Sequence, residues 1–138
     1  QVILSVVGRN KPIKNRIGPN LKLINHGRLG FDRLREEYTK SDVLVVPSFN
    51  ETFGLAYIEC LSCGTPVIHA RGEGISGYWL ENGPVGVVDP ECAQSLVACI
   101  LDMVNRKFDK NLVRSKLEEE FSWPVIAHRL MAVYKAML

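Results

Sequence analysis

Short apolar runs that end at turn-forming residues recur along the first two thirds of the chain. Continuous apolar runs of this kind predict strands covered on both faces, which is typical of parallel sheets. We expect buried strands at Val2–Val7 and Asp42–Pro47, further strands at Pro66–Ala70 and Val85–Val88, and a short strand at Leu21–Asn25, where the alternation is weaker.

Segments with apolar residues at helical spacing lie between these runs and after them. They are Asp32–Lys40, Gly54–Cys63, Glu91–Val104, Asn111–Phe121 and Pro124–Met137. The third is expected to bury a face made of Leu96, Cys99, Ile100, Met103 and Val104. Strands and helices alternate up to residue 104, and only helices follow. This order predicts an α/β fold, with a doubly wound, Rossmann-like, mostly parallel sheet and C-terminal helices.

Composition narrows the class of protein. The chain has 138 residues, of which 46% are hydrophobic, so it can bury a core and is not a disordered tail. Its length suits one domain or half of a two-domain enzyme. No apolar run approaches the roughly 18–20 residues that a membrane-spanning helix needs. The chain starts at Gln1 instead of Met, and we therefore expect a fragment or an excised domain.

Charge is unevenly distributed along the chain, although the net charge is only +2. Residues 1–40 hold nine Lys and Arg against three Asp and Glu, whereas the rest of the chain is acidic. The basic segment suits either an anion such as phosphate or a solvated surface.

The pair Cys60 and Cys63 has no second CxxC or nearby His pair to complete a zinc site. We expect all four cysteines to be buried thiols in a reducing compartment.

A strand–loop–helix segment carries the main candidate chemistry. The strand that ends at Pro47 runs into the loop Ser48–Gly54, and a helix begins there. The unpaired amides of a helix's first turn, together with the positive end of its dipole, form an anion site. Gly54 lets an anion approach the backbone closely. We expect the amides of Phe53, Gly54 and Leu55 to face a phosphate.

Two carboxylates bracket that predicted anion site. Glu51 precedes the helix, and Glu59 lies eight residues further on, inside it. Eight helical residues span at most about 12 Å, which matches an extended sugar, diphosphate and ribose. A carboxylate can accept hydrogen bonds from both members of a hydroxyl pair. The alternative interpretation is a capping acid at Glu51 and a solvated helical acid at Glu59.

A glycine-rich turn offers a competing interpretation. Gly72 to Gly77 reads GEGISG, which imitates a dinucleotide-binding fingerprint, with Asp89 at the end of the next strand. The helix that would follow is too short for that fingerprint, so we expect this loop to lie beside the sugar or phosphate of the ligand that Glu51 and Glu59 bracket. His69 ends the preceding strand, and it either lines the cleft or has a structural or exposed role. No D-x-D triplet is present to chelate a metal.

The eighteen residues from Glu51 to Ile68, ETFGLAYIECLSCGTPVI, resemble the E-x7-E signature of family 4 (group 1) glycosyltransferases. These are retaining enzymes of the GT-B fold. The flanking segments are also similar, and the resemblance covers roughly residues 20 to 138. It implies that residues 1–138 are the C-terminal, nucleotide-sugar-binding domain of a GT-B enzyme, a fragment that lacks the N-terminal acceptor domain.

The resemblance also implies roles for single residues. Glu51 is the catalytic candidate, which binds the donor sugar's hydroxyls nearest the reacting centre. Glu59 binds the ribose hydroxyls. The other implied contacts are the amides of Phe53, Gly54 and Leu55 with the sugar and diphosphate, and the backbone of Arg28 and Leu29 with the base.

Arg9 and Lys14 match the spacing of the family's diphosphate-binding pair, G-R-x4-K. Only a short polar loop separates them from the region like Asn20–Leu29, where the family has a helix and a strand. Either the chain is abbreviated there, or the true pair lies upstream. Thr52 replaces a usual Gly, and Gly77 stands near where many members carry a Glu.

The implied activity is transfer of a sugar from a nucleotide diphosphate sugar to a glycan, lipid or small-molecule acceptor, with retention at the anomeric carbon. The implied partners are the nucleotide sugar and the absent N-terminal domain, without nucleic acid, metal or other cofactor. The resemblance implies a cytoplasmic protein, with peripheral membrane contact left open. Two alternatives remain: a non-catalytic nucleotide-sugar-binding module and a GT-B nucleotide-sugar epimerase.

Overall fold

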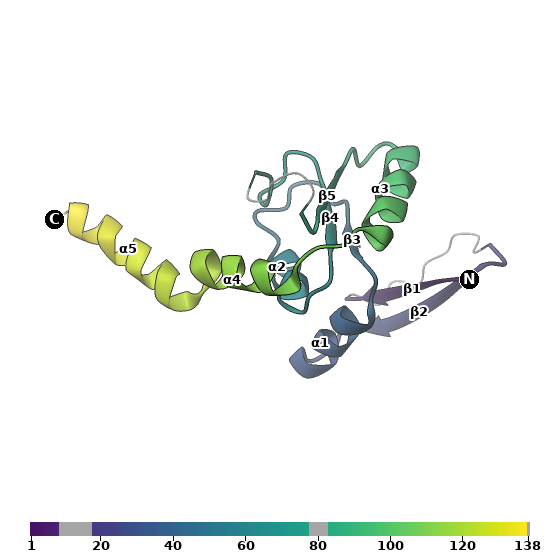
Figure 1. Ribbon diagram of the computed structural model, residues 1–138, viewed down its shortest axis with the longest axis horizontal. Helices are drawn as coiled ribbons and strands as arrows, with labels where there is room; N and C mark the ends of the chain where they lie inside the picture. The colour runs from purple at the N-terminus through teal and green to yellow at the C-terminus, as the bar shows by residue number, and fades with distance from the viewer. Residues whose placement is uncertain (9–17, 78–82, 138) are drawn as a thin grey trace. The chain divides into compact units, whose positions relative to one another are not determined.

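The computed structural model describes residues 1–8, 18–77 and 83–137, and it divides into two compact units (Figure 1). The first unit is Gln1–Lys40 and the second is Ser41–Leu138. The described elements follow the order β1-β2-α1 in the first unit and β3-α2-β4-β5-α3-α4-α5 in the second, so the C-terminal part is helical. The short helix expected before Glu81 lies outside the described residues.

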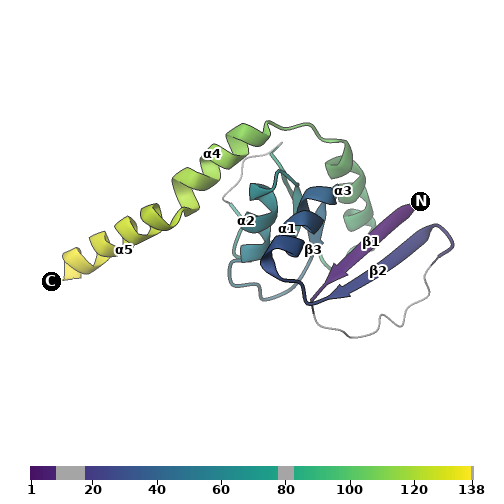
Figure 2. The ribbon, with the colours of Figure 1, turned by 90° about the horizontal axis from the view of Figure 1, so that it is seen from below.

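The first unit contains two strands and one helix. Strand β1 (Val2–Val7) pairs in parallel with β2 (Leu21–Gly27), and α1 (Phe31–Lys40) follows (Figure 2). The strand prediction for β1 is confirmed, and β2 runs further than expected. The prediction that β1 is buried is wrong, because Val2 is 64% and Ile3 59% exposed. An apolar run predicts a strand whose side chains can be buried. Burial also requires another element to pack on the strand, and a two-stranded sheet does not bury its own faces.

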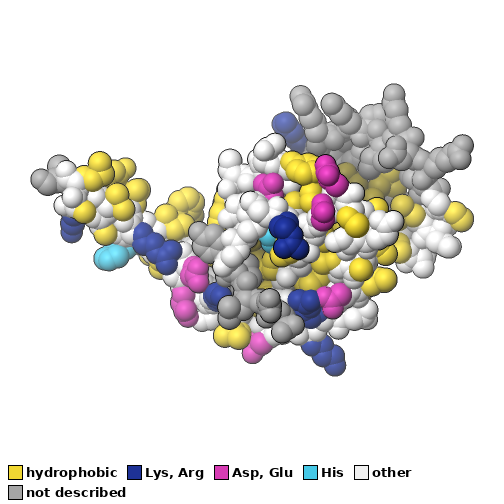
Figure 3. Space-filling view, turned by 90° about the horizontal axis from the view of Figure 1, so that it is seen from above, with side chains coloured by type: hydrophobic (Ala, Val, Ile, Leu, Met, Phe, Trp, Pro, Cys, Tyr) yellow, Lys and Arg dark blue, Asp and Glu magenta, His cyan; other side chains and the backbone are white. Residues whose placement is uncertain are grey.

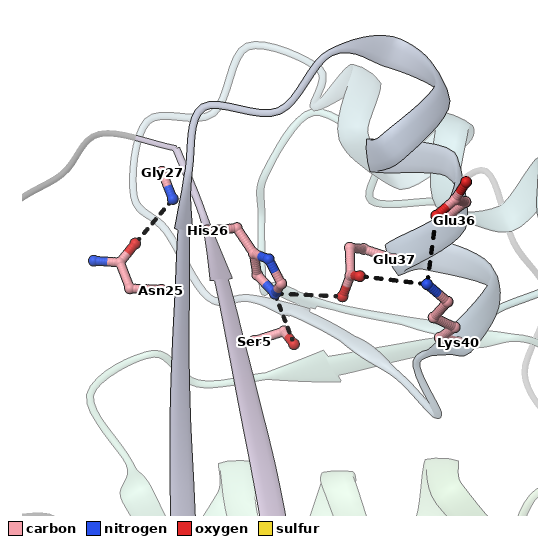
Figure 4. Close-up of polar contacts among 7 residues, drawn as sticks. All are labelled: Ser5, Asn25, His26, Gly27, Glu36, Glu37 and Lys40. Carbon is pink, nitrogen blue, oxygen red and sulfur yellow. Dashed lines mark hydrogen bonds and ion pairs between the residues drawn. The ribbon is translucent and has the colours of Figure 1, made fainter.

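Polar contacts link the three elements of this unit (Figure 4). Nε2 of His26 lies 3.4 Å from Ser5 Oγ on β1 and 3.4 Å from Glu37 Oε2 on α1. Glu37 Oε1 in turn lies 3.8 Å from Lys40 Nζ. His26 therefore connects both strands to the helix that follows them.

The second unit is built on a three-stranded parallel sheet in the order β3-β4-β5. The strands are β3 (Leu44–Val46), β4 (Val67–Ala70) and β5 (Val85–Val88). β4 is central and fully buried. Because the strands are parallel, their carboxyl ends meet at one edge, where the loops after Val46 and Ala70 begin.

Helices α2 (Leu55–Ser62) and α3 (Ala93–Asn105) lie on opposite sides of this sheet (Figures 1 and 2). Helix α4 (Lys110–Phe121) packs on α2, and α5 (Trp123–Met137) follows it. Figure 3 shows apolar side chains exposed along α5, in which no residue is buried. No helix in the described part of the chain is both long and apolar enough to cross a membrane.

The core of the second unit forms where α3 packs on the sheet. Ile68, Val88 and Met103 are its buried centre, and partly buried neighbours surround them: Val43, Val45, Leu96, Cys99 and Ile100. Four members of the predicted α3 face therefore lie in or against the core. The prediction for Val104 is wrong, since it is 48% exposed. It follows Met103 directly, and consecutive helical residues point about 100° apart.

The α/β class, the parallel pairing and the C-terminal helices are thus confirmed. The strands hydrogen-bond in two groups, β1-β2 and β3-β4-β5.

Gly86 on β5 faces α3 at close range, and a Cβ there would lie 3.1 Å from Met103 Cγ. This glycine allows the helix to approach the sheet.

His69 is buried at the carboxyl end of β4, with 1% of its surface exposed. Nδ1 donates to the Ala70 carbonyl at 2.7 Å, and the ring lies 6.0 Å from the ring of Tyr57. Burial lowers the pKa of His69 below 6.5, against smaller opposing effects of the Ala70 carbonyl and the Glu73 charge. Its surroundings support the structural interpretation instead of a cleft-lining one.

Met103→Ala should lower the free energy of unfolding by about 2–5 kcal/mol, because it removes a large side chain from the closed core. Val97→Ala on the same helix is the matched control, since Val97 is 57% exposed; it should change the value by no more than about 0.5 kcal/mol. Urea denaturation of both variants measures this. Equal losses would contradict the assignment of the core.

Acid should destabilise the protein partly through His69. Above about pH 6.5 the residue is neutral in both states, and as the pH falls below that the unfolded chain gains a proton that the folded one resists. Unfolding free energies at about pH 7.5 and about pH 5.5 should therefore differ less in His69→Gln than in the unaltered protein. The same difference in both would show that other groups carry the pH dependence.

Candidate functional site

The loop after β3 positions Glu51. It begins at the carboxyl edge of the sheet and passes through Asn50, which has a left-handed φ of 60°. Ser48 Oγ donates to Glu51 Oε2 at 3.2 Å. The Glu51 side chain is half-buried. Its carboxylate is thus oriented by a hydroxyl from its own loop.

Gly54 ends this loop as the N-cap of α2. Its backbone is left-handed, with φ 82° and ψ 68°, and no side chain forms a cap hydrogen bond there. A Cβ at Gly54 would overlap the ring of Tyr57. The first-turn amides of a helix lack the usual intrahelical acceptors, and here the Tyr57 amide donates to the Gly54 carbonyl at 2.9 Å. The N-cap residue of α2 is thus Gly54 and not Glu51.

Glu59 lies one turn beyond Leu55 within the same helix. Leu55 is 70% exposed at the first helical position, and Glu59 is half-buried. Ser62 Oγ donates to the Glu59 backbone carbonyl at 2.7 Å. The structure therefore places Glu51, Gly54, Leu55 and Glu59 on one continuous loop and helix.

Phe53 is fixed by its side chain. Its ring lies 5.5 Å from the ring of Phe121 at the end of α4, with an angle of 49° between the planes. This contact anchors the loop to the helical end of the unit.

Tyr57 is a site residue that sequence reasoning missed. It is 1% exposed, and its hydroxyl donates to the Val46 carbonyl at 2.9 Å. Burial raises the pKa of Tyr57; the hydrogen bond with Ser48 lowers it, and the charges of Glu51 and Glu73 raise it further. The available signal was its position three residues after Gly54, which puts it over the cap.

Glu73 is a second residue that was missed. Its Oε1 accepts from the Asn50 amide at 3.1 Å, and its Oε2 accepts from the Glu51 amide at 2.5 Å. Gly74 lies against the Thr52 backbone, where a Cβ would overlap the carbonyl. The glycine-rich turn thus packs beside the loop that carries Glu51. No spacing rule connects Glu73 with a residue 22 positions earlier.

Arg28 and Leu29 lie in the first unit, directly after β2. The strand ends at buried Gly27, which has φ 64° and whose amide donates to Asn25 Oδ1 at 3.1 Å. Arg28 is exposed and Leu29 half-buried. Arg9 and Lys14, the predicted diphosphate pair, lie outside the described residues.

The cysteines do not form a metal or disulfide site in the described chain. All four are free, and no group of three or more His, Cys, Asp or Glu side chains converges within residues 1–8, 18–77 and 83–137. Burial raises the pKa of Cys60 to about 12, so its thiol keeps its proton at neutral pH. Cys60 is buried as predicted, whereas Cys63, Cys92 and Cys99 are only half-buried.

Comparison with known proteins places this geometry in context. A family described as "Glycosyl transferases group 1" matches residues 1–106. The chain is 34% identical over 108 residues to D-inositol 3-phosphate glycosyltransferase of Rhodococcus jostii, covering 75% of this chain and 24% of that protein. It is 35% identical over 106 residues to D-inositol 3-phosphate glycosyltransferase 2 of Catenulispora acidiphila, covering 74% and 25%.

Solved structures share the fold. Sucrose-phosphate synthase from Thermosynechococcus elongatus superposes with a TM-score of 0.73 at 27% identity, over 84% of this chain and 30% of that one. Anabaena HepE in complex with UDP-glucose gives 0.70 at 15% identity, over 86% and 33%. This chain spans about a quarter to a third of the length of these relatives.

The family match covers most of the chain, and the superposed structures correspond to one domain of GT-B glycosyltransferases. The chain belongs to the group 1 glycosyl transferases.

Proposed function

We propose that this chain is the nucleotide-sugar-binding part of a retaining glycosyltransferase. The observation that carries the proposal is the Gly54-capped end of α2, with Glu51 just before it and Glu59 one turn inside the helix. Membership in the group 1 glycosyl transferases supports it. So does the likeness of fold to HepE, which was solved with UDP-glucose.

The donor would lie across the start of α2. The amides of Phe53, Gly54 and Leu55 would face the sugar and the diphosphate, whose negative charge the helix dipole favours. Glu59 would accept hydrogen bonds from the ribose hydroxyls, and Glu51 from the hydroxyls of the transferred sugar. Gly54 supports this arrangement because its backbone carries no side chain at the cap.

The catalytic contribution would be orientation and charge stabilisation. Glu51 would hold the sugar with its anomeric carbon facing the acceptor, and the helix amides would stabilise the charge that grows on the leaving diphosphate. That diphosphate would take the proton of the acceptor hydroxyl. Arg9 and Lys14 are the proposed cations beside it, and the backbone of Arg28 and Leu29 would face the base.

The acceptor would be bound by another part of a longer protein, because this chain spans only about a quarter to a third of its relatives. We expect the 138-residue chain to bind donor by itself and to turn over slowly or not at all.

Glu59→Ala should weaken binding of a free nucleoside diphosphate by about ten- to a hundredfold, since it removes a carboxylate that accepts from the ribose. Isothermal titration with UDP and GDP measures the dissociation constants. Glu118→Ala, at an exposed position on α4, is the control and should leave them unchanged. Equal binding by all three proteins would remove Glu59 from the site.

Glu51→Gln should leave the affinity for free UDP or GDP within about twofold but weaken binding of the corresponding sugar nucleotide by about tenfold. The reason is that Glu51 would contact only the sugar. Titrations with UDP-glucose and GDP-mannose, each compared with its diphosphate, provide the readout. A loss that is equal for the diphosphate and its sugar form would place Glu51 elsewhere on the donor.

A further inference from the structure

Two consecutive amides ahead of α2 donate to one carboxylate from a distant loop. The amides belong to Asn50 and Glu51, and the acceptor oxygens are the two of Glu73, at 3.1 and 2.5 Å. Successive N–H groups beside a left-handed residue form a concave anion site in many proteins. In this protein a side chain of the same chain occupies that site.

The left-handed backbone of Asn50 needs such support. A non-glycine residue with φ near 60° is uncommon and persists when its surroundings hold it. Hydrogen bonds to a charged acceptor are stronger than those to a neutral one. Glu73 therefore stabilises the bend that turns the chain toward Glu51.

Glu73 itself projects from a well-defined turn. The Ser76 amide donates to the Glu73 carbonyl at 2.7 Å. The next residue, Gly74, lies so close to the Thr52 carbonyl that no side chain fits between them. The two loops are therefore in backbone contact, and the reach of the Glu73 side chain to the amides follows from that contact.

Glu51 is held in two different ways. Glu73 accepts from its backbone amide, and Ser48 donates to its carboxylate at 3.2 Å. The charges of both acids raise the pKa of the Tyr57 hydroxyl, after the larger effect of its burial. Both oxygens of Glu73 thus accept from the backbone, whereas the Glu51 carboxylate accepts from the Ser48 hydroxyl.

We propose that Glu73 is a positioning residue for the donor sugar: it clamps the backbone at Asn50 and Glu51 so that the Glu51 carboxylate meets the sugar hydroxyls. This rests on the proposed function, because it concerns the same site. Glu73 acts through the loop and does not touch the donor. Substitution of Glu73 therefore weakens binding of a sugar nucleotide more than binding of the free nucleoside diphosphate.

The clamp is tested first without any ligand. Glu73→Gln and Glu73→Ala remove one or both acceptor oxygens, and Glu91→Gln at an exposed loop position is the matched control. Hydrogen exchange, resolved by NMR, should accelerate at the amides of Asn50 and Glu51 in both Glu73 variants and not in the control. Circular dichroism and thermal unfolding verify that the variants fold. Unchanged exchange at both amides in folded Glu73→Ala overturns the clamp.

The positioning role is tested by titration of the full chain with UDP-glucose, UDP, GDP-mannose and GDP. Glu73→Ala should weaken binding of the sugar nucleotide by about tenfold and leave the affinity for its diphosphate within about twofold. A merely structural defect would instead weaken binding of both compounds. The double variant with Glu51→Gln should lose no more than Glu51→Gln alone, since both act on one contact.

The outcomes separate the two proposals. If the unaltered chain binds none of the four compounds, the proposed function fails and the role of Glu73 in sugar binding fails with it, whatever the exchange shows. If the unaltered chain binds and Glu51→Gln weakens only the sugar form, but Glu73→Ala weakens neither or both equally, the proposed function stands and Glu73 is not a positioning residue.

Discussion

The contact between two loops at the carboxyl edge of the β3–β4–β5 sheet is the interaction on which the candidate site depends. The Glu73 carboxylate bridges the Asn50 and Glu51 amides, and Gly74 lies against the Thr52 backbone. These contacts support the left-handed bend at Asn50, from which the loop continues into α2. The two loops begin close together because parallel pairing brings the carboxyl ends of β3 and β4 to one edge of the sheet.

Tyr57 links strand β3 to the start of α2. Its hydroxyl is bonded to the last residue of β3, and its ring fills the space that a side chain at residue 54 would need. A glycine is required there both by the left-handed backbone and by the neighbouring ring. In the proposed function, the first turn of this helix would face the diphosphate and Glu51 would precede it. A donor with a charged centre and hydroxyl-bearing ends is complementary to such a site.

Much of this arrangement follows from local patterns. Within the described residues, apolar runs located four of the strands and a weaker alternation located β2, helical spacing located the helices, and the E-x7-E segment indicated both acids and the glycine cap. Burial was predicted less well, as β1 and Val104 show, because an apolar residue is covered only if another element reaches it. The pairing of strands in two groups likewise depends on which edges meet, and periodicity within one strand does not contain that information.

The sequence by itself therefore determined the class of fold, the strand–loop–helix with its acids, and the family. These depend on residues close together in the chain, whose spacing sets their relative positions through regular backbone geometry. Only the tertiary structure decided that Glu73 bonds to the amides of residues 50 and 51, that Tyr57 lies over the glycine cap, and that His69 is buried. Each of these contacts joins residues that are brought together by the packing of the sheet and its loops. No local sequence pattern predicts such contacts.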